Sequence, residues 1–125
     1  MAVQYDIEIR ADRDFYLPIS VVSEQNNPSD FTGYLPVMTV KTNLAQADAS
    51  ALYHGGPWSQ NLSFGQFTFK IARSVNAAWF VGSGPISTSV VYDVVVQDTA
   101  AIAVNWVTLV EGNVSIIGPV TKAIP

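Results

Sequence analysis

Cysteine is absent from this sequence of 125 residues. Its absence excludes disulfide frameworks, thiolate zinc sites, iron–sulfur clusters and thiol nucleophiles, and it leaves the redox compartment open. The first residues also lack a basic segment followed by an apolar run, so no secretory signal is predicted. No apolar stretch approaches the roughly 18 to 20 residues that a membrane-spanning helix needs. We therefore expect a soluble protein made in the cytoplasm, with no membrane partner.

Charge is also scarce, because charged residues make up 13% of the chain where about 25% is typical of soluble domains. The six basic residues are scattered, and ten acidic ones outnumber them. Nucleic-acid binding depends on a concentrated positive surface, so we expect no nucleic-acid partner. Scarce charge together with a mean hydropathy of +0.25 predicts a surface that neighbouring molecules partly cover.

Helical periodicity is nearly absent, whereas alternating and continuous β-type runs recur along the whole chain. Apolar and polar residues alternate cleanly from Gln4 to Arg10 and from Gln66 to Ile71. Turn-forming residues separate roughly eight short runs of this kind, a pattern typical of a β-sandwich. We predict a single all-β domain over residues 1–125, an antiparallel β-sandwich of two sheets. Its predicted core contains Ile7, Ile9, Phe67, Phe69, Ile71, Val94 and Val96.

Prolines and small residues predict the local structure of several segments. Proline lacks the N–H that a central strand needs, so we place Pro18 at an edge or a bulge. For the same reason, strand pairing after Pro36 is expected to begin near Val37. The stretch Asn43 to Ser50 is predicted as a loop or a single helical turn. A capped helical turn linking two strands is predicted where Ser74 precedes a short apolar run.

The carboxy-terminal third is the most regular part of the sequence. Three segments rich in valine and isoleucine are predicted as successive strands, namely Ser87 to Gln97, Ile102 to Leu109 and Val114 to Ile117. A turn at Glu111–Gly112–Asn113 is expected before the last of them, since glycine supplies a permissive backbone. Upstream, Gly82–Ser83–Gly84 lacks the residues of a phosphate-binding loop and is interpreted as a connection between strands.

Residues that could carry catalysis or bind a metal are few. His54 is the single histidine and stands beside two glycines and a proline, which predicts a surface turn instead of a catalytic or metal-binding position. Asp12 and Asp14 have a spacing found in calcium loops, but Arg13 lies between them and no further acidic ligand follows. We therefore predict a protein that is not an enzyme and needs no metal or other cofactor, and we expect no small-molecule ligand.

Three tryptophans are the residues best suited to form a binding surface. Trp79 and Trp106 are predicted to pack in the core or between the sheets. Trp58 lies between proline and serine in a predicted loop, where local packing and contact with a partner fit the sequence equally well. Tyr53 is close to it in the sequence, so Tyr53 and Trp58 are our candidate partner-contact residues. Together with His54 they also support an alternative, a carbohydrate- or receptor-binding module.

Three parts of the chain, taken in order, carry a resemblance to a known family. They read DFYLPI (residues 14–19), DFTGY (30–34), and YDVVVQD (92–98) followed by VEGNVSI (110–116). Together they resemble small phage virion domains, the immunoglobulin-like modules of tail and baseplate proteins. The resemblance implies an immunoglobulin-like β-sandwich located in the virion, with other virion proteins and copies of itself as partners. It implies no catalytic residues, and the family has no counterpart for Asn43 to Ala51 or His54 to Ser59.

The resemblance and the composition together predict a non-enzymatic structural protein of a phage virion, which joins subunits of a tail, baseplate or fibre attachment. A capsid decoration or cement protein is an alternative, because it would likewise be small, acidic, cysteine-free and rich in β-structure. We also predict an oligomer or a protein present in many copies. The reason is that interface cores are rich in aromatic residues and poor in lysine and glutamate, as this composition is.

Overall fold

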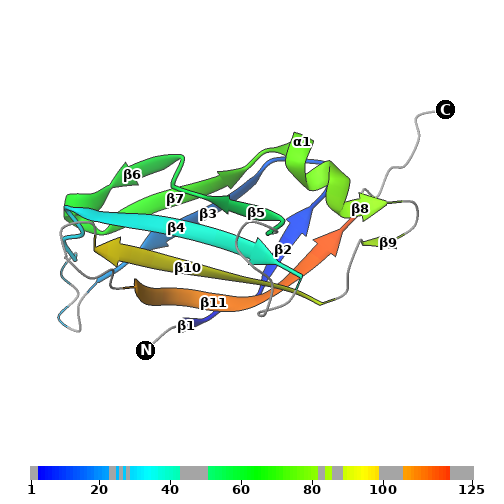
Figure 1. Ribbon diagram of the computed structural model, residues 1–125. Helices are drawn as coiled ribbons and strands as arrows, with labels where there is room; N and C mark the ends of the chain where they lie inside the picture. The colour runs from blue at the N-terminus through cyan, green and yellow to red at the C-terminus, as the bar shows by residue number, and fades with distance from the viewer. Residues whose placement is uncertain are drawn as a thin grey trace.

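The computed structural model describes residues 3–22, 25, 27, 29–42, 51–81, 84–85, 89–98 and 106–118. Its two main sheets pack face to face around one core, which confirms the predicted all-β sandwich (Figure 1). The described residues contain no helix long and apolar enough to cross a membrane. The loop or turn predicted at 43–50 and most of the connection predicted at 82–84 lie outside the described residues.

The larger sheet has the order β1-β11-β10-β4-β5, with β2 also paired to β11. Its strands are β1 (Val3–Gln4), β2 (Ile7–Arg10), β4 (Tyr34–Lys41), β5 (Tyr53–Gly55), β10 (Val90–Asp98) and β11 (Trp106–Ile117). β10 runs antiparallel to both of its neighbours, as predicted, but β1 and β2 run parallel to β11. Parallel strands need a long connection, and here almost the whole domain lies between β2 and β11 in the chain.

The smaller sheet has the order β3-β7-β6 and is antiparallel throughout. It consists of β3 (Phe15–Ser20), β6 (Ser59–Asn61) and β7 (Gln66–Ile71), with the 3-10 helix η2 (Leu62–Phe64) between β6 and β7. Pro18 lies in β3, an edge strand, as its missing N–H predicted. Gly65 follows η2 with a φ of 63°, a left-handed conformation that favours glycine.

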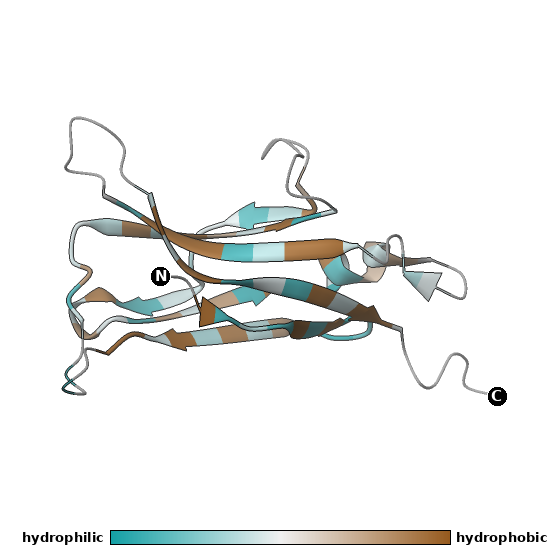
Figure 2. Cartoon of the chain, turned by 90° about the horizontal axis from the view of Figure 1, so that it is seen from below, coloured by the Kyte–Doolittle hydropathy of each residue, from teal (hydrophilic) through white to brown (hydrophobic). Residues whose placement is uncertain are grey.

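The core lies between the sheets and is built from side chains that alternate along the strands, as the bands of hydropathy in Figure 2 show. All seven residues predicted for it are buried, with exposed fractions between 0 and 6%. Every second residue of β10 from Val90 to Val96 is buried, including Tyr92. Phe67 and Phe69 meet edge to face, with ring centroids 5.7 Å apart. Burial of these apolar surfaces is the main force that holds the two sheets together.

Pro36 lies inside β4, a central strand, so the prediction that pairing begins near Val37 is wrong. The carbonyl of Val40 accepts a hydrogen bond from the N–H of Leu52, so Val40 and every second residue before it direct their backbone groups toward β5. The nitrogen of Pro36 therefore faces the side of β5 and not the side of β10. Because β5 pairs with β4 only from Met38 onward, the missing N–H of Pro36 removes no hydrogen bond to either neighbouring strand.

β11 continues without interruption through Glu111–Gly112–Asn113, so the predicted turn there is wrong, and the last two predicted strands are one. Glycine is required at this position for another reason. A side chain at Gly112 would collide with the backbone of Tyr5, because the junction between β1 and β2 lies against β11 at this point. The N–H of Tyr5 donates to the carbonyl of Glu111 at 2.9 Å, which fixes the close approach.

A helical segment and a small hairpin follow the smaller sheet. They are α1 (Arg73–Asn76), η3 (Ala77–Trp79), β8 (Phe80–Val81) and β9 (Gly84–Pro85). The predicted helical turn is confirmed, but Ser74 does not cap it, since the cap position is occupied by Ala72. The carboxylate of Asp14 instead accepts the N–H of Arg73 at 2.7 Å. Trp79 is 3% exposed and packs in the core, as predicted.

Candidate functional site

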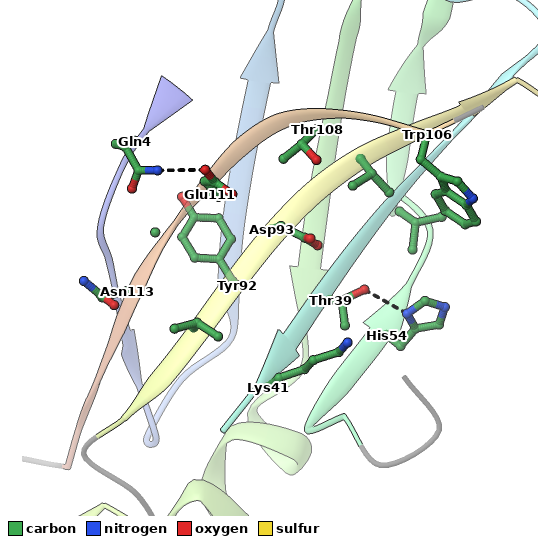
Figure 3. A pocket seen from close by; sticks show the side chains of 14 residues that line it. Gln4, Thr39, Lys41, His54, Tyr92, Asp93, Trp106, Thr108, Glu111 and Asn113 are labelled. Atoms are coloured by element: carbon green, nitrogen blue, oxygen red, sulfur yellow. Dashed lines mark hydrogen bonds between the residues drawn. The ribbon is translucent and has the colours of Figure 1, made fainter. Parts of the chain in front are cut away.

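A groove of about 550 Å³ lies on the outer face of the larger sheet. Side chains from β1, β4, β5, β10 and β11 line it, and Figure 3 shows them from close by. The groove receives these side chains because successive residues of a strand point to opposite faces of its sheet. Thr39 of β4 and Asp93 of β10 alternate with core residues of their strands and therefore point away from the core, although Thr39 is only 7% exposed. We call this depression the sheet groove.

A row of polar residues crosses the sheet groove from one side of the sheet to the other. The strand register sets five of them side by side, in the order His54, Thr39, Asp93, Glu111 and Gln4. Neighbours in such a row are one strand spacing apart, about 4.8 Å. The polar row was not predicted from the sequence, because its members come from five separate segments. The one local signal is Asp93, a charged residue in the middle of the valine-rich β10.

Hydrogen bonds fix both ends of the polar row. Nδ1 of His54 and the hydroxyl oxygen of Thr39 are 2.8 Å apart and share a hydrogen bond. At the other end, the side-chain amide of Gln4 donates to a carboxylate oxygen of Glu111, also at 2.8 Å. Between these pairs, Asp93 lies directly opposite Glu111 on the neighbouring strand. Like charges in this arrangement repel each other, so the middle of the row favours the approach of a cation.

The charged residues of the sheet groove are Asp93, Glu111 and Lys41, so carboxylates outnumber the single ammonium group. Within the described ranges, no group of three or more histidine, cysteine, aspartate or glutamate residues is arranged to hold a metal ion. The chemistry that the groove offers is therefore the binding of a molecule that donates hydrogen bonds or carries a positive group.

Trp106 stands in the sheet groove and is 52% exposed, so the prediction that it packs in the core is wrong. Strict alternation would put it on the same face as Val114 and Ile116, which are buried. The register between β10 and β11 shifts at Val94 and Val95, and this irregularity inserts one extra residue in β11. The insertion reverses the face of every residue before it, and Trp106 consequently points outward.

Trp58 is 62% exposed and packs against the outer face of the smaller sheet. Its backbone N–H donates to the carbonyl of Thr68 at 2.9 Å. Its ring meets the ring of Tyr16 edge to face, with centroids 5.4 Å apart, and Tyr16 is itself 46% exposed. The ammonium group of Lys70 lies 5.7 Å from the centroid of each ring, within the range of a cation–π interaction. We call Tyr16, Trp58 and Lys70 the aromatic surface.

Tyr53 and His54 lie in the strand β5 and not in a loop or turn shared with Trp58. Tyr53 is half-buried against the core, and its hydroxyl donates to the carbonyl of Lys70 at 3.5 Å. Burial raises the pKa of Tyr53. β5 belongs to the larger sheet, whereas Trp58 precedes β6 of the smaller sheet. The two candidate contact residues therefore lie on different sheets, and Trp58 is the more exposed of the two.

Asp12 and Asp14 follow β2, and each binds a neighbouring group of the chain. A carboxylate oxygen of Asp12 lies 3.2 Å from Nε of Arg10 and 3.4 Å from Nε of Arg13. The hydrogen bond from Arg10 is the main cause that lowers the pKa of Asp12. Asp14 accepts the first N–H of α1, that of Arg73. The spacing that suggested a calcium loop thus serves ion pairs and a helix cap.

A second groove, of about 810 Å³, opens at the side of the sandwich between β2 and β3. Three large hydrophobic side chains that line it are exposed, Val3 at 61%, Tyr5 at 56% and Tyr16 at 46%. Tyr16 also belongs to the aromatic surface. Exposed apolar groups therefore continue from this edge groove onto the outer face of the smaller sheet.

Comparison of the chain with protein-family models finds no match, and comparison with curated proteins finds none either. The function proposed below consequently rests on the geometry just described and on the resemblance of the three segments quoted from the sequence.

Proposed function

We propose that this chain is a non-enzymatic structural protein of a phage virion, an immunoglobulin-like module that joins subunits of a tail, baseplate or fibre attachment. The observation that carries the proposal is the pair Trp58 and Tyr16, which touch each other and are 62% and 46% exposed. Aromatic side chains are enriched in the buried centres of protein interfaces and dominate their binding energy. An exposed pair on the face of a sheet is the kind of surface that a partner covers.

The strand order supports the immunoglobulin-like part of the proposal. In that fold one sheet contains strands B, E and D, and the other contains C, F and G, with C′ added in variable-type domains. In their order across each sheet, β3, β7 and β6 correspond to B, E and D, and β11, β10, β4 and β5 correspond to G, F, C and C′. Antibody domains have a disulfide between the sheets and a buried tryptophan on strand C. The core of this chain differs, because the chain has no cysteine and the fully buried residue in the middle of β4 is Met38.

The phage and virion parts of the proposal rest on the resemblance in sequence. Its first segment supplies most of β3, and the segment 92–98 supplies most of β10. The resembling residues therefore belong to both sheets and to the framework of the fold. The scarcity of charge fits the same proposal, because a module surrounded by other subunits does not need a fully charged surface.

Incorporation of variants into phage particles tests the proposal. Trp58→Ala removes the largest ring of the aromatic surface, and we expect it to weaken incorporation by about 30-fold, the effect of losing an interface hot spot. Phe64→Ala is the matched control, because Phe64 is also an exposed aromatic residue, at 53%, but lies in η2 outside the aromatic surface. Circular dichroism shows whether each variant is folded.

A folded Trp58→Ala variant that enters particles as efficiently as the wild type contradicts the proposal. The position in the virion requires one more comparison, the binding of the purified chain to isolated tails and to isolated capsids. Binding to tails alone supports the tail or baseplate position, and binding to capsids alone supports the alternative, a capsid decoration protein.

A further inference from the structure

The aromatic surface and the sheet groove point in opposite directions. Tyr16 and Lys70 are cross-strand neighbours that face outward, because the adjacent pair, Leu17 and Phe69, is buried. The sheet groove lies on the outer face of the other sheet. Since the two sheets pack through their inner faces, their outer faces look away from each other. One copy therefore cannot place its aromatic surface in its own groove, whereas a second copy can.

The sheet groove has the size and the lining to receive an aromatic side chain. Its volume of about 550 Å³ lies within the range of roughly 300 to 1,000 Å³ of pockets that enclose small molecules. Val95 supplies apolar surface beside the exposed ring of Trp106, whereas Val37 is only 7% exposed. A Trp58 ring from another copy would contact Val95 and Trp106, and aromatic pairs add stabilisation beyond the area that they bury.

Charge favours the same pairing. The ammonium group of Lys70 lies beside both rings of the aromatic surface, so it would enter the groove with them. There it would approach Asp93 and Glu111, the carboxylates that stand opposite each other in the polar row. In the single copy Lys70 is 3.9 Å from Asp14, a surface ion pair of the kind that contributes little to stability. The exchange keeps the ammonium group of Lys70 beside carboxylates, in a groove whose described lining contains one cation of its own, Lys41.

We propose that copies of this chain associate head to tail, with Trp58 and Tyr16 of one copy seated in the sheet groove of the next and Lys70 facing Asp93 and Glu111. The inference rests on the proposed function and names its partner, a second copy. The contact joins two different faces, so each copy keeps one face free for a further copy. Such a contact builds a ring or a filament and not a closed dimer.

Two variants test this arrangement, and each of them is damaged on a single face. Trp58→Ala removes the main ring of the aromatic surface and leaves the groove intact. Thr108→Arg fills the groove with a bulky cation and leaves the aromatic surface intact. We expect the wild-type mass in sedimentation velocity to increase between about 10 μM and 1 mM, the range of weak association, while each variant alone stays at 13.5 kDa.

An equal mixture of the two variants gives the most specific result. The aromatic surface of Thr108→Arg still fits the groove of Trp58→Ala, but neither protein can extend the contact further. We therefore expect the mixture to form a dimer of one copy of each and nothing larger. A contact between identical faces would not produce this outcome, because each face would be damaged in one of the two proteins.

Exchange of charges tests the contact between Lys70 and Glu111. Lys70→Glu and Glu111→Lys should each weaken association by about 10-fold, and the double variant should recover most of the loss, because the exchanged charges meet across the interface. Phe64→Ala is again the control and should associate as the wild type does.

Three results overturn the inference. They are a wild-type chain that stays at the mass of one copy up to about 1 mM, a mixture that forms no dimer, and a double charge variant as weak as the single ones. Particle incorporation separates these results from a failure of the proposed function. If Trp58→Ala is lost from particles while the mixture stays monomeric, the partner is a different protein and the head-to-tail contact is wrong. If Trp58→Ala enters particles normally, the proposed function is wrong as well.

Discussion

Tyr92 carries a hydroxyl group into the core, where it is 3% exposed and donates to the carbonyl of Tyr5. That carbonyl lies at the junction between β1 and β2, beside Gly112. A side chain of β10 thus holds the junction between the first two strands, both of which pair with β11. Burial, together with the nearby charges of Tyr5 and Asp6, raises the pKa of Tyr92 to about 12.

Replacement of Tyr92 by phenylalanine removes the donor and keeps the ring. We expect Tyr92→Phe to lower the free energy of unfolding by about 1 to 2 kcal/mol at neutral pH, since the Tyr5 carbonyl loses its partner. The raised pKa stabilises the folded state below pH 10, and this contribution is lost as the pH rises through about 12. Urea unfolding across this range should show a steeper loss of stability in the wild type than in the variant. Equal slopes would contradict the role assigned to Tyr92.

Asp14 is a second residue whose effect is local, because its carboxylate binds the N–H of Arg73 at the start of α1. We expect Asp14→Ala to lower the free energy of unfolding by about 1 kcal/mol, the usual effect of losing a helix cap. Asp12→Ala is the matched control and should have a smaller effect, because Asp12 binds only neighbouring arginines. Thermal unfolding measures both, and neither variant should impair particle incorporation. Equal destabilisation by the two would contradict the capping role.

Among the elements, β3 is the strand whose free edge needs protection, and Pro18 supplies it. Thr68 of β7 lies opposite Pro18 and directs its carbonyl away from β3, where the carbonyl accepts a hydrogen bond from the N–H of Trp58. The pair Pro18 and Thr68 therefore exchanges no bond across β3 and β7. The nitrogen of Pro18 faces the free edge, so its missing N–H removes a donor only where another chain could pair.

Pro18→Val restores that donor. We expect the free energy of unfolding to change by less than about 1 kcal/mol, while aggregation becomes faster because the edge offers a continuous row of donors. Ser20→Val is the control, since it adds the same side chain to the same edge without adding a donor. Light scattering during incubation at raised temperature compares the three proteins. If Ser20→Val aggregates as fast as Pro18→Val, apolarity and not the restored N–H is the cause.

The fold class and the inward residues of the regular strands could be predicted from the sequence, because a period of two is visible within one strand. Trp106 was assigned to the wrong face because the bulge in β11 depends on how β10 pairs with it, and one segment alone does not reveal its partner. Pro36 was misjudged for a related reason. Whether its missing N–H matters depends on where the neighbouring strand β5 ends.

The candidate site could be predicted only in part, for the same physical reason. Trp58 was recognisable as an exposed aromatic residue because proline precedes it in a connecting segment. Its neighbours Tyr16 and Lys70 come from β3 and β7, and the polar row combines five strands. Such groupings depend on strand order and register, which sequence periodicity does not contain.

At the scale of the whole molecule, one core is shared by both sheets, so the chain should unfold as a single cooperative unit. Phe69 is fully buried, at 0% exposure, and belongs to this core. We expect Phe69→Ala to lower the free energy of unfolding by about 3 to 5 kcal/mol. Urea unfolding followed by tryptophan fluorescence and by circular dichroism should give the same midpoint for both signals. Separate midpoints would show that the two sheets unfold independently.

The parallel pairing of β2 with β11 determines how the molecule responds to tension. Ile7 lies beside Val114 and Arg10 lies beside Ile117, so the strand that enters and the strand that leaves point the same way. Force applied to the two ends of the chain would drag these strands past each other along their length. All hydrogen bonds between them would then be loaded at once, in shear, whereas a sideways pull would break them one after another.

If the chain joins subunits as proposed, a module loaded in this way would transmit traction between them. Stretching of single molecules should therefore need a higher force from the chain ends than from handles at Glu8→Cys and Ser115→Cys, which lie opposite each other and pull β2 and β11 apart sideways. The chain has no cysteine of its own, so both attachment points are unambiguous. Equal rupture forces in the two directions would mean that the load is carried elsewhere in the sandwich.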